Sequence, residues 1–129
     1  MNPENKMSIL VVDDDEVVGR VLSRVLTQQG HLVWQAQTAS QAMSRAREHS
    51  PRLALLDLCL PDGDGLELAR QLRQEHPGLV LILMTAYPLR LREHPQLTGA
   101  FTRVLIKPLD LADLRQAVES SLTEVVSQK

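Results

Sequence analysis

The sequence predicts an α/β fold in which a five-stranded parallel β-sheet is covered by helices on both faces. Three observations support this prediction. The chain has 129 residues, the size of one ordinary domain, and 43% of them are hydrophobic against 23% charged. Several apolar runs of strand length show no polar alternation, as expected for strands buried on both faces. Helical patterns lie between these runs, and this alternation is typical of parallel sheets with right-handed crossovers.

Five segments have the length and composition of strands. Four are continuous apolar runs, at residues 8–12, 53–57, 79–84 and 103–106. The fifth, at residues 31–36, mixes polar and apolar side chains. Because a central strand of a parallel sheet is apolar on both faces, this mixed segment is expected at or near an edge.

The first two connections carry helix signals. After the first strand, apolar residues recur at helical spacing, and Gly30 follows as a stop signal. These apolar positions are Val17, Val18, Val21, Leu22, Val25 and Leu26. The second helix is expected to begin at Thr38, because Thr38 and Gln41 have the spacing of a capping box.

The later connections predict two regular helices and one irregular helix. A third helix is expected over residues 65–75, and a last helix begins at Asp110, a good N-cap, and carries an apolar stripe. The fourth connection contains Pro88 and Pro95. Pro95 must end or kink whatever helix has formed, so the fourth helix is expected to be irregular.

Composition narrows the classes of function. The formal net charge of −2 gives no field that would attract nucleic acid or an anionic membrane. Aromatic residues make up only 2%, too few for a base-stacking platform. The single cysteine, Cys59, forms no internal disulfide and fits a reducing compartment, and no apolar run reaches the length needed to span a bilayer. A cytoplasmic location is expected.

Polar residues follow four of the predicted strands at the end where the chain leaves them. They are Asp13, Asp14 and Asp15, then Asp57, then Thr85, and finally Lys107. In an open parallel sheet, ligands bind in the crevice outside these carboxyl ends. We therefore expect the side chains to converge there.

A cluster of this kind indicates phosphoryl chemistry. Neighbouring carboxylates repel one another and need a cation, and Mg²⁺, or Mn²⁺ in its place, is the divalent ion that prefers oxygen ligands and keeps several waters. Lys107 adds a positive charge and Thr85 a hydroxyl donor. Asp57 could then act as a carboxylate nucleophile.

Each of these residues also has an ordinary explanation. Asp57 alone would be a turn residue, Asp13 and Asp14 could cap the first helix, and Lys107 could be a surface lysine. Their joint occurrence at the same end of successive strands favours a site over coincidence.

Four motifs resemble the receiver domain of two-component response regulators. They are "ILVVDDDE" at 9–16, "LALLDLCLPDGDGLEL" at 53–68, "LILMTAY" at 81–87 and "LIKPLD" at 105–110. The resemblance implies a flavodoxin-like, doubly wound sheet with strand order 2-1-3-4-5. It covers residues 7–126, which leaves 1–6 as a flexible N-terminal extension and 127–129 as a C-terminal tail.

The resemblance also implies roles for the site residues. Asp57 corresponds to the phosphoacceptor, which takes a phosphoryl group from a phosphohistidine on a sensor histidine kinase or phosphotransfer protein. Asp13 and Asp14 correspond to the acidic pair that holds Mg²⁺, completed by Asp57 and by the backbone carbonyl of Cys59.

Two further positions complete the resemblance. Thr85 corresponds to the switch hydroxyl that turns toward the phosphoryl group, and Lys107 to the ammonium that pairs with it. A cis peptide bond is implied before Pro108. The chain would be a phosphorylation-controlled signalling switch that catalyses only its own phosphorylation and dephosphorylation, and its effector or output domain is not indicated by the sequence.

Three other functions are compatible with parts of the pattern. An aspartyl-phosphate phosphatase or phosphotransferase would need a second acid two residues after Asp57, where Cys59 stands. A flavin binder would need aromatic side chains, which are scarce. A degenerate receiver would bind partners without phosphorylation, but all the phosphoryl residues are present. Neither nucleic acid nor membrane is expected to contact this domain.

The chain departs from the family pattern near its last strand. Val104 stands where receivers commonly carry an aromatic residue that moves with the threonine. We also hypothesise that the bulk of Tyr87, two residues after Thr85, slows self-dephosphorylation. A phosphorylated Tyr87→Ala variant with an unchanged or longer lifetime would contradict that idea.

Overall fold

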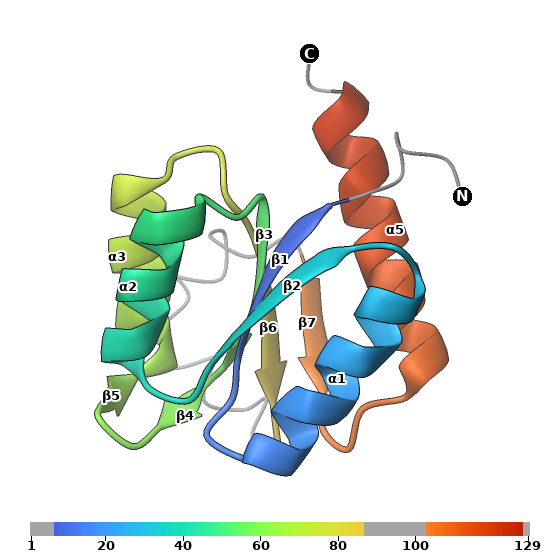
Figure 1. Cartoon of the computed structure of the whole chain (residues 1–129). Helices are drawn as coiled ribbons and strands as arrows, with labels where there is room; N and C mark the ends of the chain where they lie inside the picture. The colour runs from blue at the N-terminus through green and yellow to red at the C-terminus, as the bar shows by residue number, and fades with distance from the viewer. Residues whose placement is uncertain (1–6, 87–102, 128–129) are drawn as a thin grey trace.

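A five-stranded parallel sheet forms the centre of the molecule (Figure 1). The computed structural model describes residues 7–86 and 103–127. The strands lie in the order β2-β1-β3-β6-β7. Their bounds are β1 Ser8–Val12, β2 Leu32–Ala36, β3 Leu53–Asp57, β6 Val80–Thr85 and β7 Arg103–Ile106. This confirms the predicted sheet and the strand order 2-1-3-4-5, with the fourth strand shifted by one residue from its predicted bounds.

Helices cover both faces of this sheet, as predicted. Figure 1 shows α2 and α3 on one face and α1 and α5 on the other. The helices are α1 Glu16–Gln28, α2 Ala39–His49, α3 Gly65–Glu75 and α5 Leu111–Ser127. The irregular helix expected around Pro88 and Pro95, and Tyr87, lie outside the described residues. Within the described ranges, no helix has both the length and the apolar character to cross a bilayer.

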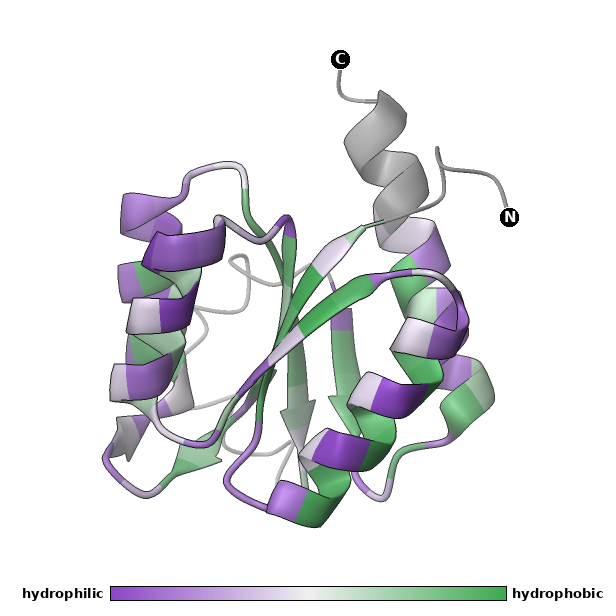
Figure 2. Cartoon of the chain, in the orientation of Figure 1, coloured by the Kyte–Doolittle hydropathy of each residue, from purple (hydrophilic) through white to green (hydrophobic). Residues whose placement is uncertain are grey.

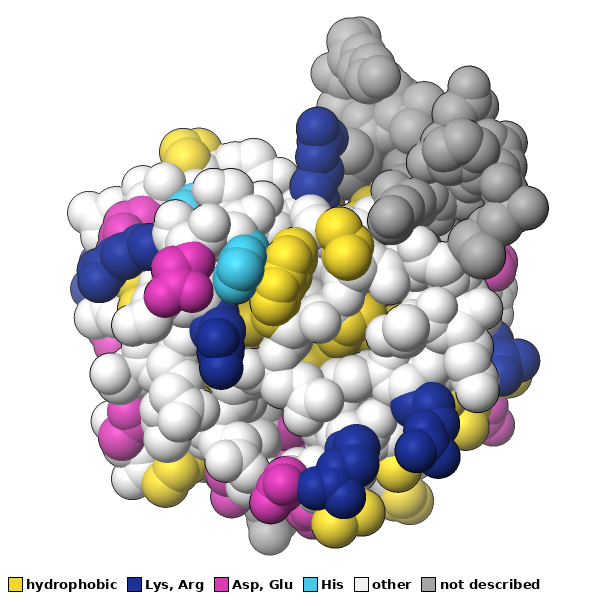
Figure 3. All heavy atoms as spheres, viewed as in Figure 1, with side chains coloured by type: hydrophobic (Ala, Val, Ile, Leu, Met, Phe, Trp, Pro, Cys, Tyr) yellow, Lys and Arg dark blue, Asp and Glu magenta, His cyan; other side chains and the backbone are white. Residues whose placement is uncertain are grey.

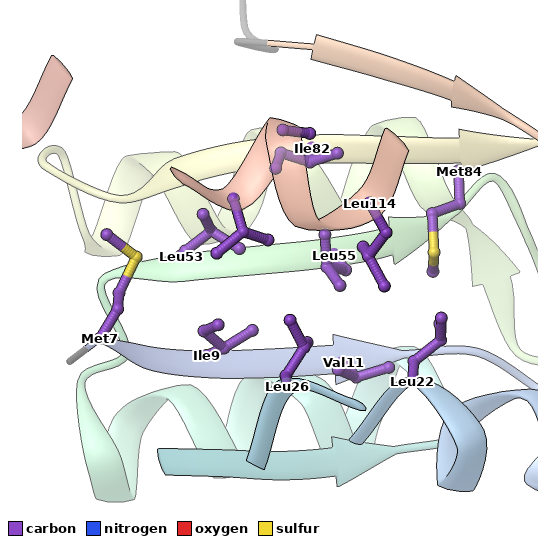
Figure 4. Close-up of a cluster of buried hydrophobic side chains, with 12 residues drawn as sticks. Met7, Ile9, Val11, Leu22, Leu26, Leu53, Leu55, Ile82, Met84 and Leu114 are labelled. Carbon is purple, nitrogen blue, oxygen red and sulfur yellow. The ribbon is translucent and has the colours of Figure 1, made fainter. Parts of the chain in front are cut away.

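Alternating residues of the central strands belong to two hydrophobic clusters, one on each face of the sheet. Ile9 and Val11 of β1 face a cluster with α1 and α5, which Figure 4 shows between the sheet and these helices. Leu10 and Val12 belong to the other cluster, on the side of α2 and α3. All four side chains are fully buried. Because both faces of the sheet are covered at its centre, the central strands β3 and β6 are almost entirely apolar, as the hydropathy colours in Figure 2 show.

The edge strand and the helix ends follow local signals. The mixed segment predicted near an edge is β2, which among the described strands pairs with β1 alone. Gly30, the predicted stop after α1, has a positive φ of 96°, a conformation that glycine adopts without strain. Asp110 accepts hydrogen bonds from the amides of Ala112 and Asp113, so it caps α5 as predicted.

The N-terminal cap of α1 is Asp15 rather than Asp13 or Asp14. Its Oδ1 accepts hydrogen bonds from the amides of Val17 at 2.9 Å and Val18 at 3.3 Å. The capping explanation for Asp13 and Asp14 is therefore wrong, because a third aspartate performs that task. Asp13 and Asp14 are therefore free of a capping role at the carboxyl end of β1.

A short hairpin follows β3 and was not predicted. It consists of β4 Cys59–Leu60 and β5 Gly63–Asp64, which pair in antiparallel register, and Pro61 and Asp62 form its tip. The hairpin lies directly after Asp57, so it forms one wall of the region described next.

Candidate functional site

The carboxyl ends of four strands bring the predicted site residues to one edge of the sheet. Asp57 ends β3 in register with Met84 of β6, and Thr85 ends β6 in register with Ile106 of β7. Asp13 directly follows β1, whose last residue pairs with β3. This register places Asp13, Asp57, Thr85 and Lys107 side by side, as the sequence predicted.

Three carboxylates lie together in this crevice. Oxygen atoms of Asp13, Asp14 and Asp57 are all within 4.8 Å of one another. Asp13 is 2% exposed and Asp57 6%, whereas Asp14 is exposed to solvent. Two buried negative charges and a third beside them need positive charge nearby.

Lys107 supplies that charge. Its Nζ donates to Asp13 Oδ2 and to Asp57 Oδ2, both at 2.8 Å. Burial alone would lower the pKa of Lys107, but the hydrogen bonds to Asp13 and Asp57 outweigh it and raise the pKa above its ordinary value. Burial raises the pKa of Asp13, and the hydrogen bond from Lys107 opposes that shift. Lys107 therefore carries its proton and bridges the two buried acids.

Backbone amides hold the remaining carboxylate oxygens. Asp57 Oδ1 accepts from the amide of Cys59 at 3.0 Å, and Asp13 Oδ1 accepts from the amide of Asp15 at 2.9 Å. Each buried acid thus has a donor on both oxygens. Hydrogen bonds to the charged form of a carboxylate favour that form and fix its orientation.

Gly65 allows the backbone to close behind Asp57. A Cβ atom at this position would collide with the carbonyl oxygen of Asp57 and would lie 2.8 Å from the Cα of Leu58. Real Cβ atoms do not approach backbone this closely, so only glycine fits. The amide of Gly65 donates to the carbonyl of Leu58 at 2.8 Å, which fastens the start of α3 to the end of β3.

The remaining predicted residues lie beside this cluster. Thr85 is buried, and its carbonyl accepts from the amide of Lys107 at 2.8 Å. The Lys107–Pro108 peptide bond is cis, as the resemblance implied. Cys59 lies on β4 and is exposed to solvent. Val104 lies on β7 and is 39% exposed.

The donor set fits a hard divalent cation. All three side chains in the cluster offer carboxylate oxygens, the ligand type that Mg²⁺ binds in proteins. No soft sulfur or imidazole side chain belongs to the cluster among the described residues. The arrangement can therefore hold a cation and, next to it, a transferred anionic group.

Sequence reasoning missed one side chain next to this site. Asp62, at the tip of the hairpin, accepts hydrogen bonds from the amides of Ala39 and Ser40 at the start of α2. The sequence shows only an acidic residue in a turn. Because its partners lie more than 20 residues away, no local pattern could have identified the contact.

Comparison with known proteins identifies the class of this domain. The family model described as "Response regulator receiver domain" matches residues 9–119. The chain is 32% identical over 115 residues to sporulation initiation phosphotransferase F of Bacillus subtilis, covering 88% of this chain and 92% of that protein. The chain therefore belongs to the response regulator receiver family, and it is a phosphorylation switch of two-component signalling with its acidic pocket and Lys107 in place.

Solved structures show the same fold. A CheY-like receiver domain protein from Methanospirillum hungatei superposes with a TM-score of 0.89 at 28% identity, covering 95% of this chain and 98% of that one. The response regulator TrrA of Thermotoga maritima, solved in complex with Mg(2+)-BeF, gives a TM-score of 0.80 at 26% identity, covering 88% and 97%.

Other relatives are longer than this chain. The match to the probable transcriptional regulatory protein TcrX of Mycobacterium tuberculosis is 39% identical over 80 residues, 62% of this chain, and spans only 34% of TcrX. The chain thus spans about a third of that relative.

Proposed function

We propose that Asp57 is the phosphoacceptor and that its Mg²⁺-dependent phosphorylation is the switch of this domain. The observation that carries this proposal is the bridge from Lys107 to Asp13 and Asp57 at the carboxyl ends of the strands. A carboxylate oxygen of Asp57 would attack phosphorus while the P–N bond of a phosphohistidine breaks. The bonding electrons stay on the imidazole nitrogen, and an acyl phosphate forms on Asp57.

Each neighbour has a role in this transfer. Asp13, Asp14 and Asp57, with the backbone carbonyl of Cys59, would hold Mg²⁺, or Mn²⁺ in its place, and the bound ion neutralises phosphoryl charge. Lys107 places an ammonium beside Asp57 and stabilises the developing negative charge on the transferred group. The hydroxyl of Thr85 would then bond to a phosphoryl oxygen and so report that Asp57 is modified.

The phosphodonor would dock on an apolar groove that adjoins the site. This groove encloses about 250 Å³ between α1 and the start of α5. It is lined by Val17, Val18, Val21, Leu22, Lys107, Pro108, Leu109 and Leu111. Figure 3 shows hydrophobic and basic side chains together over α1. Because Lys107 belongs to both the groove and the acidic cluster, a partner seated in the groove would lie next to Asp57.

The sequence predicted the groove residues of α1 as part of an apolar stripe on the first helix. Leu22, Val25 and Leu26 are buried, but Val17 is 66% exposed and Val21 46%. Exposed valines on a helix are unusual when they gather in one place, and such patches mark interaction sites. An amphipathic helix of a sensor histidine kinase or phosphotransfer protein would fill this groove with its apolar face.

We also propose that residues 7–126 form the receiver unit, between an extension at 1–6 and a tail at 127–129, and that it works in the cytoplasm. The family match over 9–119 supports the unit. Cys59 is the single cysteine of the chain, and such sparse use of cysteine fits a reducing compartment.

Phosphorylation by a small donor tests the proposed function. Incubation with acetyl phosphate and Mg²⁺ should add one phosphoryl group, seen by intact mass spectrometry. The adduct should be absent in Asp57→Asn and in EDTA, because the nucleophile or the cation is missing. Asp113→Asn, which removes an exposed acid of α5, should be labelled normally.

Two outcomes would refute the proposal. An unmodified wild-type chain would indicate a degenerate receiver that acts through binding alone. A phosphoryl group retained in Asp57→Asn would place the acceptor elsewhere.

A further inference from the structure

The hairpin β4–β5 is anchored at both ends to different helices. At its base, Asp64 caps α3 by accepting from the amide of Leu66 at 2.9 Å, and the amide of Gly65 donates to the carbonyl of Leu58. At its tip, Asp62 reaches α2. The segment that follows Asp57 is therefore clamped between the N-termini of α2 and α3.

The contact at the tip is a two-oxygen cap. Asp62 Oδ1 accepts from the amide of Ala39 at 2.7 Å, and Oδ2 accepts from the amide of Ser40 at 3.1 Å. These amides begin α2 and have no partner within the helix. They hold the pKa of the Asp62 carboxyl below its usual range. A carboxylate at a helix N-terminus also interacts favourably with the helix dipole.

Helix α2 has a local N-cap in addition to Asp62. The bonds from Asp62 therefore connect the hairpin to a helix end that is already capped. Thr38 Oγ1 accepts from the amide of Gln41 at 3.0 Å, which is the ordinary N-cap bond. Thr38 and Asp62 thus divide the first three amides of α2 between a local cap and a remote one. Only the remote cap ties the hairpin to the helix.

A short path of contacts leads from this cap to the site. Cys59 pairs with Asp64 and Leu60 pairs with Gly63, so the tip and the base of the hairpin move together. Cys59 also donates its amide to Asp57 Oδ1 at 3.0 Å. Displacement of the tip would therefore shift the amide that orients the Asp57 carboxylate.

We propose that Asp62 is a positioning residue of the phosphoryl site: by capping α2 it fixes the hairpin that orients Asp57 and the Cys59 carbonyl. This inference rests on the proposed function, in which Asp57 and that carbonyl contact Mg²⁺. Asp62 itself does not belong to the carboxylate cluster of Asp13, Asp14 and Asp57. It acts through the hairpin.

Three variants separate this role from simple stabilisation. Asp62→Ala removes both acceptors, and Asp62→Asn keeps one acceptor but also loses the charge. Thr38→Ala removes the local cap of the same helix and leaves the hairpin contact intact. Each variant is measured for thermal unfolding, for Mg²⁺ affinity by isothermal titration calorimetry, and for phosphorylation rate with acetyl phosphate.

We expect the two caps to differ in what they affect. Asp62→Ala and Thr38→Ala should lower Tm by similar amounts, because each frees amides at the same helix end. Only Asp62→Ala should raise the Mg²⁺ Kd and slow phosphorylation, each by about ten-fold, the lower end of what loss of groups that orient metal ligands costs. Asp62→Asn should fall between Asp62→Ala and the wild type. Since both Asp62 variants lose the charge, the difference between them measures the hydrogen bond.

The inference is overturned if Asp62→Ala binds Mg²⁺ and is phosphorylated like the wild type. It is equally overturned if Thr38→Ala weakens Mg²⁺ binding as much as Asp62→Ala. A wild-type chain that binds Mg²⁺ but takes no phosphoryl group would refute the proposed function alone, because the calorimetric comparison still decides the role of Asp62.

Discussion

At the scale of single residues, the site depends on how buried charges are balanced. Asp13 and Asp57 are buried carboxylates, and Lys107 donates to both at 2.8 Å. Removing one partner of such a group leaves a buried charge uncompensated, which is far more costly than losing a surface ion pair. The surface pair of Arg20 and Glu16 on α1, by contrast, is worth little to stability.

Another buried polar residue, His31, lies outside the site, where the segment before β1 meets α1 and α5. Its Nδ1 accepts from the amide of Met7 at 3.0 Å, before β1, and its own amide donates to the carbonyl of Leu26 in α1. The charge that influences the pKa of His31 is the carboxylate of Glu119 in α5. Burial lowers the pKa of His31 below 6.5, and Glu119 opposes this shift.

This geometry predicts a pH dependence of stability. The folded state holds His31 neutral, because a protonated Nδ1 could not accept from Met7. Its contribution is therefore fully present above pH 6.5, the pKa of an unperturbed histidine, and is lost as the pH falls through the lowered pKa of the folded state. His31→Gln should lower the free energy of unfolding by about 1 kcal/mol at neutral pH. It should also remove part of the decline of that free energy as the pH falls.

Urea unfolding at a series of pH values between about 5 and 8 would measure this effect. Wild type and His31→Gln should lose unfolding free energy at different rates as the pH falls. Parallel curves for the two proteins would show that His31 does not contribute to the dependence.

At the scale of elements, α1 has two tasks. Its inner face packs Leu22 and Leu26 into the core with α5 and the sheet. Its outer edge carries the exposed Val17 and Val21 into the groove. One helix therefore supports the fold and offers the docking surface proposed for the phosphodonor.

Val17→Glu tests this second task. Val17 is largely exposed, and a glutamate in the first turn of a helix is favourable, so the variant should fold. It should be phosphorylated by acetyl phosphate at the wild-type rate. Transfer from the histidine kinase that best phosphorylates the wild type in a kinase panel should slow by about ten-fold, because a charge replaces an apolar contact at an interface.

Gln28→Glu is the matched control for the added charge. Gln28 is exposed on α1 and does not line the groove. Transfer from the kinase should be unaffected in this variant. Equal slowing in both variants would show that charge alone, and not the groove, determines the rate.

At the scale of the whole molecule, the site should couple metal binding to folding. The three carboxylates come from the ends of β1 and β3, so they gather only when the sheet has formed. A cation that binds this cluster binds the folded state alone. At about 100 times its Kd, such a ligand stabilises the fold by about 2.7 kcal/mol, which raises Tm by several degrees.

Thermal unfolding with and without Mg²⁺ would measure this rise in Tm. Addition of EDTA should return Tm to its metal-free value. Asp14→Asn should abolish most of the rise at little cost to the metal-free fold, because Asp14 is exposed. An equal rise in Tm for Asp14→Asn and wild type would place the stabilising ion outside the cluster.

The sheet and the cluster of Asp13, Asp14 and Asp57 could be predicted from the sequence, because apolar runs mark the strands and polar residues mark where those strands end. Each continuous apolar run marks a buried strand, and Asp57 and Lys107 stand directly after such runs. Parallel strands bring those ends together whatever the loops contain. The positions of the acids were therefore fixed by the pattern.

Other features depended on contacts between distant segments. An apolar stripe looks the same whether it is fully covered or partly open, so the exposure of Val17 and Val21 was not predicted. Asp62 looks like any turn residue until α2 is seen beside it. Asp15 differs from Asp13 and Asp14 only in its distance from the helix start.

The bridge made by Lys107 joins residues that lie 94 and 50 positions apart in the chain. A nascent polypeptide that ends before β7 would hold its two buried acids without their counter-charge. The pocket is therefore completed late, when the last strand docks against β6. This domain would therefore gain its phosphoryl chemistry only once β7 and Lys107 have been synthesised and have docked beside the earlier strands.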